Sequence, residues 1–276
     1  LLNKMPLLQT LVFIHCPDIV IVTETWATPC VSNSELNIQG YDYIRNDRHE
    51  GRGGGSCIYI KQPLTFLPLD YRQFTAVEES CWLRVVLKDN YSLLVGCVYR
   101  PPNASGDYDL RLSQAFHAAV DLNMKYCLIA GDFNLPEVHW FPPSGPAKFE
   151  NLLEAIDTGM WDQEVASHLE VLIAGDFNAP MIDWVNLTVD GALTSFGRKL
   201  MDLTLDQSLV QKVNIPTRFR ENKRENCLDL VLTKDVSSID EVYSIAPLGK
   251  SDHSTLMWDY SLYSQRQNGT ECKQNI

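Results

Sequence analysis

Several acidic, amide and imidazole side chains follow directly after apolar, strand-like runs of the sequence. They are Glu24 in VTETW, Asp132 and Asn134 in a first GDFN, Asp176 and Asn178 in a second GDFN, Asp229 in CLDLVLT, and Asp252 and His253 in KSDHS. Because each group ends or follows an apolar run, we expect all of them to emerge at one rim of a sheet. Such residues can hydrolyse a phosphodiester, because they provide hard oxygen ligands for a divalent cation beside a base that activates water.

Taken one at a time, these residues have ordinary structural explanations. A carboxylate at a strand end is usually a turn former, and an Asp-His pair is more often a surface pair or a helix cap. GDFN by itself fits a strand-to-helix turn in which Asn caps the helix. The specificity of the pattern therefore lies in the ordered set.

The elements that must position these groups are predicted by hydrophobic periodicity. Apolar and alternating runs predict strands at residues 18–24, 53–61, 81–88, 91–99, 126–130, 228–233 and 254–260, with a hairpin turn at Asp89-Asn90. Helical spacing predicts helices at residues 109–122, 148–156 and 195–206. Strands first, then strands mixed with helices, indicate an α/β sandwich of two sheets.

An internal repeat is the most informative feature of the organisation. The run LIAGDFN at residues 128–134 recurs at 172–178, an offset of 176 − 132 = 44 residues. The likeness extends to Pro136/Pro180 and Trp140/Trp184, which gives two strand–loop–helix units at about 127–165 and 171–213. We interpret this as a junction between two related sequences, near residues 162–168, rather than as a fresh tandem duplication.

Length and composition limit the other possibilities. A chain of 276 residues with 45% hydrophobic residues predicts one large domain at about 1–262, followed by a polar, loose tail at 263–276. No apolar run approaches the roughly 20 residues that cross a bilayer, so no membrane partner is expected. The eight cysteines include no CxxC, which favours small buried hydrophobes in a reducing compartment.

The net charge of −12 argues against a protein that coats nucleic acid passively. Carboxylates that hold a cation are a different case, because the cation reverses the local charge. Two basic stretches either hold phosphates or form solvated loops, and the sequence leaves both explanations open. They contain Arg45, Arg48, His49 and Arg52, and then Arg218, Arg220, Lys223 and Arg224.

Seven ordered runs resemble the endonuclease/exonuclease/phosphatase superfamily, which includes apurinic/apyrimidinic endonucleases and type I deoxyribonuclease. They are PDIVIVTETW, RGGGSCIYIK, VYRPPN, LIAGDFN with a following Trp, PTRFRE, LDLVLT and KSDHS, and they span Asn3 to Tyr260. The residues of these runs are most similar to those of the endonuclease domains of non-LTR retrotransposons. The resemblance implies the two-sheet α/β sandwich of type I deoxyribonuclease.

The resemblance also implies a role for each matching residue. Glu24 would bind the metal, Asp252 would support the metal site, and Tyr99 would contact the scissile phosphate. The GDFN aspartate, Asp132 or Asp176, would position or deprotonate the attacking water, and its asparagine, Asn134 or Asn178, would hold that aspartate and the phosphate. Asp229 would orient His253, which would stabilise the phosphate charge, and Arg100 and Arg218 would bind phosphate. The implied cofactor is Mg²⁺ or Mn²⁺.

Two departures from the family pattern affect these expectations. Members usually begin with a strand that carries an Asn metal ligand, and this chain starts after that point, so we expect an N-terminally truncated fold. The second departure is the duplicated GDFN unit. We expect one copy to fill the central position and the other to be displaced to the periphery. Contiguity with the strands of Asp229 and His253 favours Asp176 and Asn178, so Asp176→Asn should abolish activity and Asp132→Asn should not.

The leading functional hypothesis is a Mg²⁺-dependent endonuclease that nicks DNA, in a nuclear or cytoplasmic setting. In the parent element, a reverse transcriptase domain on the same chain would use the exposed 3′-hydroxyl. Two alternatives stay open. One is a phosphatase or phosphodiesterase that acts on a small phosphoester, since fold does not settle substrate. The other is a decayed or misassembled reading frame without activity.

Overall fold

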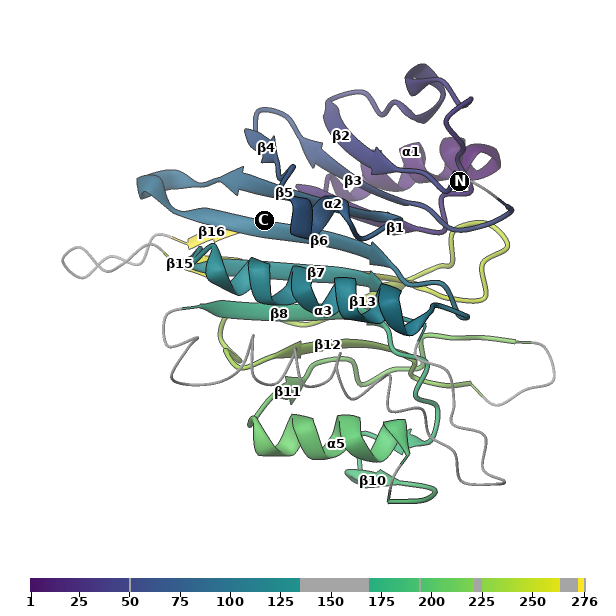
Figure 1. The fold of residues 1–276 in the computed structure, drawn as a ribbon, viewed down its shortest axis with the longest axis vertical. Helices are drawn as coiled ribbons and strands as arrows, with labels where there is room; N and C mark the ends of the chain where they lie inside the picture. The colour runs from purple at the N-terminus through teal and green to yellow at the C-terminus, as the bar shows by residue number, and fades with distance from the viewer. Residues whose placement is uncertain (50, 135–168, 194, 221–224, 264–272, 276) are drawn as a thin grey trace.

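The computed structural model of the chain describes residues 1–49, 51–134, 169–193, 195–220, 225–263 and 273–275. Its largest element is a seven-stranded sheet with the order β11-β12-β8-β7-β6-β5-β4 (Figure 1). Strands β6, β7 and β8 are parallel, and the other pairings are antiparallel. The strands are β4 (Phe66–Pro68), β5 (Ser80–Val86), β6 (Ser92–Tyr99), β7 (Tyr126–Asp132), β8 (Glu170–Asp176), β11 (Val210–Gln211) and β12 (Asp229–Thr233).

A second, antiparallel sheet packs on one face of the first. It has the order β1-β3-β2 and consists of β1 (Ile19–Thr23), β2 (Tyr41–Asn46) and β3 (Ser56–Lys61). Ile58 and Ile60 of β3 are fully buried in one cluster with Val95, Leu128 and Val231 of the large sheet. This contact between the two inner faces makes the molecule a two-sheet sandwich.

Helices cover the opposite face of the seven-stranded sheet (Figure 1). Helix α3 (Gly106–Asp121) begins at Ser105, whose hydroxyl accepts from the Tyr108 amide. Helix α5 (Phe196–Asp206) begins at Ser195 in the same way. Their apolar stripes join one core with the outward face of the sheet, while α1 (Met5–His15) packs on the outer side of the smaller sheet. The short helix α2 (Arg72–Thr75) contacts α3.

Short strand pairs complete the described fold. They are β9 (Ile182–Asp183) with β10 (Thr188–Val189), β13 (Tyr243–Ile245) with β14 (Thr255–Met257), and β15 (Ser261–Tyr263) with β16 (Lys273–Asn275). Single turns of 3₁₀ helix occur at η1 (Leu2–Lys4), η2 (Asn33–Leu36) and η3 (Lys88–Asn90). Within the predicted tail, residues 273–275 form β16 and pair with β15, whereas residues 264–272 lie outside the described residues.

Both copies of the repeated strand lie inside the seven-stranded sheet, so the expected displacement of one copy is wrong. Strand β7 pairs with β6 on one side and with β8 on the other, and Asp132 lies beside Asp176. The identical run LIAG is apolar, and both faces of the sheet are covered at this point. An extra parallel strand therefore buries its apolar surface and satisfies its backbone groups at once, which displacement would not achieve.

The other predicted elements are mostly confirmed. The strands at 18–24, 53–61, 81–88, 91–99, 126–130 and 228–233 and the helices at 109–122 and 195–206 are present, with ends shifted by a few residues, and η3 forms the predicted turn. Strand β14 is shorter than predicted, α1 and β2 were not predicted, and the predicted helix at 148–156 lies outside the described residues. Cys57, Cys81, Cys97 and Cys127 are buried free thiols, as expected, whereas Cys16 and Cys30 are exposed and Cys227 is partly exposed. None of the described helices has the length and apolarity to span a membrane.

Candidate active site

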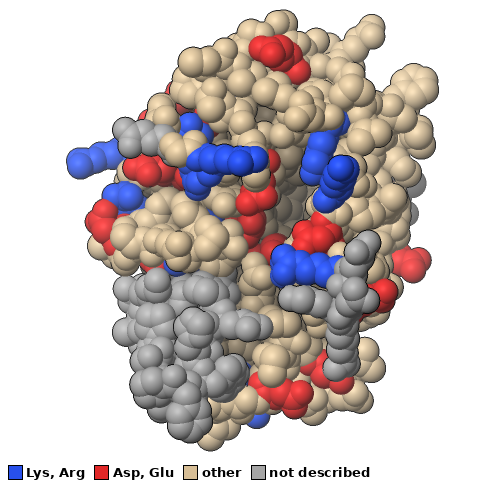
Figure 2. Space-filling model, turned by 90° about the vertical axis from the view of Figure 1, so that its right-hand side faces the viewer, with Lys and Arg blue, Asp and Glu red and all other residues tan. Residues whose placement is uncertain are grey.

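The candidate residues converge at the rim where the parallel strands end. The strand registers place Tyr99 beside Asp132, Asp132 beside Asp176, and Asp176 beside Asp229. Paired residues in a sheet point to the same face, so these four side chains form a row, which we call the rim row. Figure 2 shows this side of the molecule, where acidic side chains gather in a hollow between lysine and arginine side chains.

One end of the rim row contacts the second sheet. The Tyr99 hydroxyl donates to Oε1 of Glu24 at 3.3 Å, and Glu24 follows strand β1. Burial, together with the charge of Glu24, raises the pKa of Tyr99 to about 12, so its hydroxyl stays protonated and able to donate. The guanidinium of Arg48 lies over the Tyr99 ring, 5.6 Å from its centre. This end therefore offers a carboxylate, a phenol and a cation.

The other end of the rim row holds the imidazole. Nδ1 of His253 lies 2.9 Å from Oδ2 of Asp229, and its Nε2 lies 3.7 Å from Oδ2 of Asp176. Burial lowers the pKa of His253, but the hydrogen bond and charge of Asp229 outweigh it and raise that pKa to about 9. The imidazole is thus protonated at neutral pH and oriented by Asp229, with its second N–H directed toward Asp176.

The two central carboxyls are unusually basic. Burial raises the pKa of Asp132 to about 8, and the charges of Asp176 and Glu24 add to the effect. Burial likewise raises the pKa of Asp176 to about 7, with Asp229 as the next cause. A carboxyl that titrates near neutral pH is suited to accept a proton from water.

The asparagines of the two GDFN runs close a tight turn after each strand. The backbone N–H groups of Asn134 and Asn178 donate to Oδ1 of Asp132 and of Asp176, at 3.1 and 2.7 Å respectively. Both asparagines have positive φ, 43° and 51°, a conformation that Asn tolerates better than most residues. The Asn178 amide group also donates to Oδ2 of Asp176 at 3.0 Å and to Oδ1 of Asn134 at 3.4 Å. The two copies are therefore connected through their asparagines.

The prediction that Arg100 binds phosphate is wrong. Arg100 is fully buried, and Asp109 of α3 accepts from its Nε and Nη2 at 2.7 and 3.0 Å. Its Nη1 donates to the backbone oxygen of Asn134 at 2.8 Å. A guanidinium committed in this way supports the first GDFN loop from behind and is not available to an exposed ligand.

Arg218 and Asp252 do lie at the rim, but they pair with one another. Nε of Arg218 and Nε of Arg220 both donate to Oδ2 of Asp252, at 3.1 and 2.6 Å. Burial opposes ionisation of Asp252, yet the bond from Arg220 and the charge of His253 hold its pKa below the usual value. Phosphate binding by Arg218 and metal support by Asp252 stay predictions.

Sequence reasoning missed two residues that position the site. The Thr217 hydroxyl accepts from the amides of Leu228 and Asp229, both at 3.0 Å, and so fixes the start of β12. Glu79 is buried and accepts from Arg48 Nε and from the Gly55 amide, at 3.0 and 2.7 Å. The glycine cluster and PTRF were visible signals, but their partners are distant in sequence.

The donor chemistry at the rim fits a hard divalent cation. Glu24 and Asp132 present carboxylate oxygens, and the charges of Asp176 and Glu24 act on Asp132, where burial already disfavours a charge. A cation would relieve that repulsion. Within the described residues, no three His, Cys, Asp or Glu side chains already form a metal-binding group. Further oxygens would therefore have to come from water or from a phosphate.

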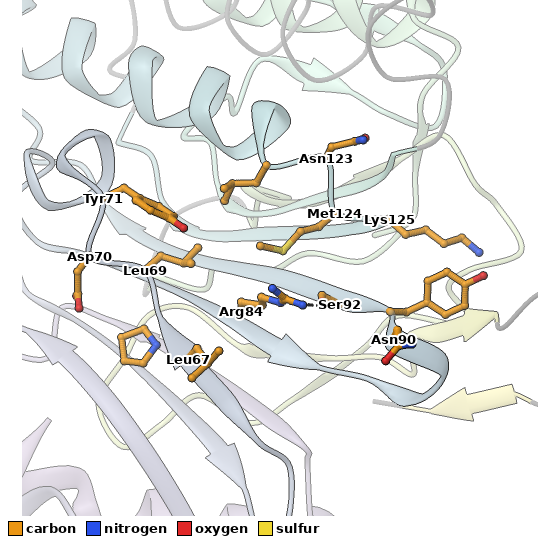
Figure 3. Close-up of a pocket in the computed structure, with 13 residues that line it drawn as sticks. Leu67, Leu69, Asp70, Tyr71, Arg84, Asn90, Ser92, Asn123, Met124 and Lys125 are labelled. Carbon is orange, nitrogen blue, oxygen red and sulfur yellow. Dashed lines mark hydrogen bonds between the residues drawn. The ribbon is translucent and has the colours of Figure 1, made fainter.

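A separate cavity lies at the other end of the sheet. It measures about 880 Å³ and is lined by Arg84, Ser92 and Lys125, among others (Figure 3). Ser92 opens β6 and Lys125 precedes β7, whereas the rim row lies where these strands end. This cavity is therefore separate from the candidate site.

Comparison with solved structures shows the same fold. The endonuclease domain of the telomere-specific non-LTR retrotransposon TRAS1 has a TM-score of 0.54 and 13% identity, over 94% of this chain and 92% of that one. An apurinic/apyrimidinic endonuclease from Leishmania major has a TM-score of 0.55 and 14% identity, over 93% and 84%. A 3′ phosphatase from Neisseria, bound to a product DNA hairpin, has a TM-score of 0.53 and 15% identity, over 94% and 94%.

Sequence models of protein families match both halves of the chain, whereas no curated protein sequence matches it. An endonuclease-reverse transcriptase model matches residues 141–257, which include the second GDFN. The endonuclease/exonuclease/phosphatase family model matches residues 7–158, which include the first. The match to this family model covers more than half of the chain, so the chain belongs to the endonuclease/exonuclease/phosphatase family.

Proposed function

We propose that this protein is a Mg²⁺-dependent phosphodiesterase that nicks DNA. The observation that carries the proposal is the rim row, in which the Asp229–His253–Asp176 chain and the Glu24–Tyr99 pair lie at one end of the sheet. The family and the endonucleases of the same fold support a phosphodiester of DNA as the substrate. From the match to the endonuclease-reverse transcriptase model, we propose a reverse transcriptase domain on the chain of the parent element. A nuclear or cytoplasmic location stays a prediction.

The residues divide the work of hydrolysis among them. When bound, Mg²⁺ (or Mn²⁺) supplies charge neutralisation at the phosphate, and Glu24 with Asp132 would hold it. Asp176 accepts a proton from the attacking water, because its raised pKa makes it a competent base near neutral pH. Asn178 holds that carboxylate in place. His253, kept protonated by Asp229, donates to the phosphate oxygen on which negative charge develops.

Plasmid nicking tests the proposal. Supercoiled DNA with Mg²⁺ should be converted to the nicked form, and EDTA should stop the conversion. His253→Gln should lower the rate by roughly 10²–10⁴, the range for loss of a proton-transfer or charge-stabilising group. His117→Gln is the matched control, because His117 is exposed on α3, away from the rim row.

Four outcomes would contradict the proposal. Nicking that resists EDTA would exclude the cation, and equal rates for the two histidine variants would exclude His253. Hydrolysis of p-nitrophenyl phosphate with plasmid left intact would instead support the small-phosphoester phosphatase. No activity on either substrate would favour a decayed reading frame.

A further inference from the structure

The geometry points to a divided active site. We propose that the doubled strand separates the catalytic groups into two half-sites, with Asp132 serving Glu24 and Tyr99 and Asp176 serving Asp229 and His253. We further propose that removal of one 44-residue repeat joins the two sets on a single aspartate. This inference rests on the proposed function and assigns the part that each GDFN copy takes in it.

The contacts of the two aspartates define the half-sites. Asp132 is the register neighbour of Tyr99, which donates to Glu24, and the charge of Glu24 acts on the Asp132 carboxyl. Asp176 is the register neighbour of Asp229, and His253 bridges these two carboxylates. Each aspartate therefore meets only one half of the machinery closely.

Strand β8 repeats the relation of β7 to its neighbour. The carbonyl of Asp132 accepts from the Arg100 amide at 2.8 Å, and the carbonyl of Asp176 accepts from the Phe133 amide at 3.0 Å. A Cβ on Gly131 would collide with the Val98 backbone, and a Cβ on Gly175 would collide with the Gly131 backbone in the same way. The second copy is thus the first copy moved sideways by one strand.

This translation makes either copy dispensable for the pairing of the sheet. Strands β6, β7 and β8 are parallel, so β6 could pair with β8, or β12 with β7, without reversing a direction. Deletion of residues 133–176 leaves Asp132 followed by Phe177, which restores an uninterrupted LIAGDFN. The register positions of Tyr99 and Asp229 would then both face the same aspartate.

The division matters because reacting groups must come close together. Neighbouring strands lie about 4.8 Å apart, so the extra strand moves the Glu24 half away from the His253 half by that amount. Reacting atoms need a separation of about 3–3.5 Å, and a misplacement of about 1 Å costs roughly 10² in rate. The full chain should accordingly cleave slowly, and the single-copy chain should cleave faster.

The first test compares the full chain with the 133–176 deletion in the plasmid assay with Mg²⁺. We expect the deletion variant to nick at least about 10² times faster. Adding Asp132→Asn to the deletion should abolish that gain, because no second aspartate remains to replace it. A folded deletion variant that nicks no faster than the full chain would overturn the inference.

A second test needs neither activity nor a deletion that folds. In EDTA, urea denaturation of the full chain is measured for Glu24→Gln combined with Asp132→Asn, and for Glu24→Gln combined with Asp176→Asn. The shifts in midpoint should fail to add for the first pair, because both changes relieve the same repulsion, and should add for the second pair. Equal coupling in the two pairs would overturn the division. If neither chain nicks DNA, the proposed function fails, while this comparison still decides between one site and two halves.

Discussion

At the scale of single residues, the rim row is a place where burial and function oppose each other. Asp132 and Asp176 are held away from water and beside other carboxylates, which raises the pKa of both. A structural role alone would be served better by neutral side chains, since unpaired buried charge costs stability. The unfavourable burial of these carboxyls is consistent with a catalytic role, because it provides a base that titrates near neutral pH and oxygens that can bind a cation.

The raised pKa of Asp132 predicts that replacing this residue stabilises the protein to a degree that depends on pH. Its pKa is about 8 in the folded protein, compared with 3.8 for an ordinary Asp carboxyl, so between these values the native state binds more protons than the unfolded state. The free energy of unfolding must therefore fall as pH rises from about 4 to about 8. Asp132→Asn should remove that loss and stabilise the metal-free protein at pH 8, by on the order of 1 kcal/mol or more.

Urea denaturation in EDTA at pH 4, 6 and 8 measures this effect. The difference between Asp132→Asn and the unchanged protein should grow with pH. Asp202→Asn, on the exposed side of α5, is the control and should show no such trend. A difference that shrinks as pH rises would mean that Asp132 is paired with a cationic group in the folded state.

At the scale of elements, the sheet has absorbed a complete extra strand without losing its order. Two strands that share the run LIAGD lie side by side, each followed by an Asn turn and each passing its neighbour at a glycine. The Arg100–Asp109 pair anchors the first of the two loops to α3. The second loop is held through Asn178 and through the Phe177 amide, which donates to the Leu228 carbonyl just before β12. Different supports thus hold identical sequences.

Alanine at the close-approach glycines tests this placement of β8. Gly131 and Gly175 have φ of 156° and 136°, and a Cβ on either would strike the backbone of the adjacent strand. Gly131→Ala and Gly175→Ala should each lower the free energy of unfolding by about 1–3 kcal/mol or more. Gly106→Ala, at the start of α3 with open space around it, should be neutral or stabilise by about 0.5–1 kcal/mol. A harmless Gly175→Ala would show that β8 does not lie against β7.

At the scale of the whole molecule, the charge distribution limits how DNA can be held. The chain carries a net charge of −12, so attraction to phosphates must come from local cations around the rim row. Arg48, Arg218 and Arg220 lie there, each tied to a carboxylate that keeps it in place. Such a surface favours contact with a short length of DNA around the cleavage point over contact with an extended length.

The salt dependence of DNA affinity should be shallow. Three arginines on phosphates predict a slope of log Kobs against log salt of about −3, since each contact contributes about −0.9. The measurement uses fluorescence anisotropy of a labelled duplex with the His253→Gln variant, which prevents cleavage. Arg220→Ala should flatten the slope by about 1, and Arg72→Ala on α2 should leave it unchanged. A slope of about −6 or steeper would place most phosphate contacts elsewhere.

The sequence by itself determined the family, the order of most elements and the residues of the rim row. These are local properties: periodicity marks a strand, and a polar residue at its end marks a rim. Glu24, Asp229 and His253 were found in this way, and Tyr99 was found through the family resemblance. In the structure Tyr99 contacts Glu24, and His253 contacts Asp229. Helix α1 and strand β2 were not predicted because the hydrophobic periodicity of their sequences is weak, and tertiary packing against the smaller sheet stabilises them.

Only the tertiary structure decided what became of the repeat and of Arg100. The sequence contains two equal candidates for one strand position, and it cannot say whether they compete or lie side by side. That outcome depends on whether the sheet can cover both faces of an added strand and satisfy its backbone, which involves residues far apart in the chain. Likewise, nothing in VYRPPN reveals that Arg100 turns inward to Asp109, because burial with a partner is a property of the packed molecule.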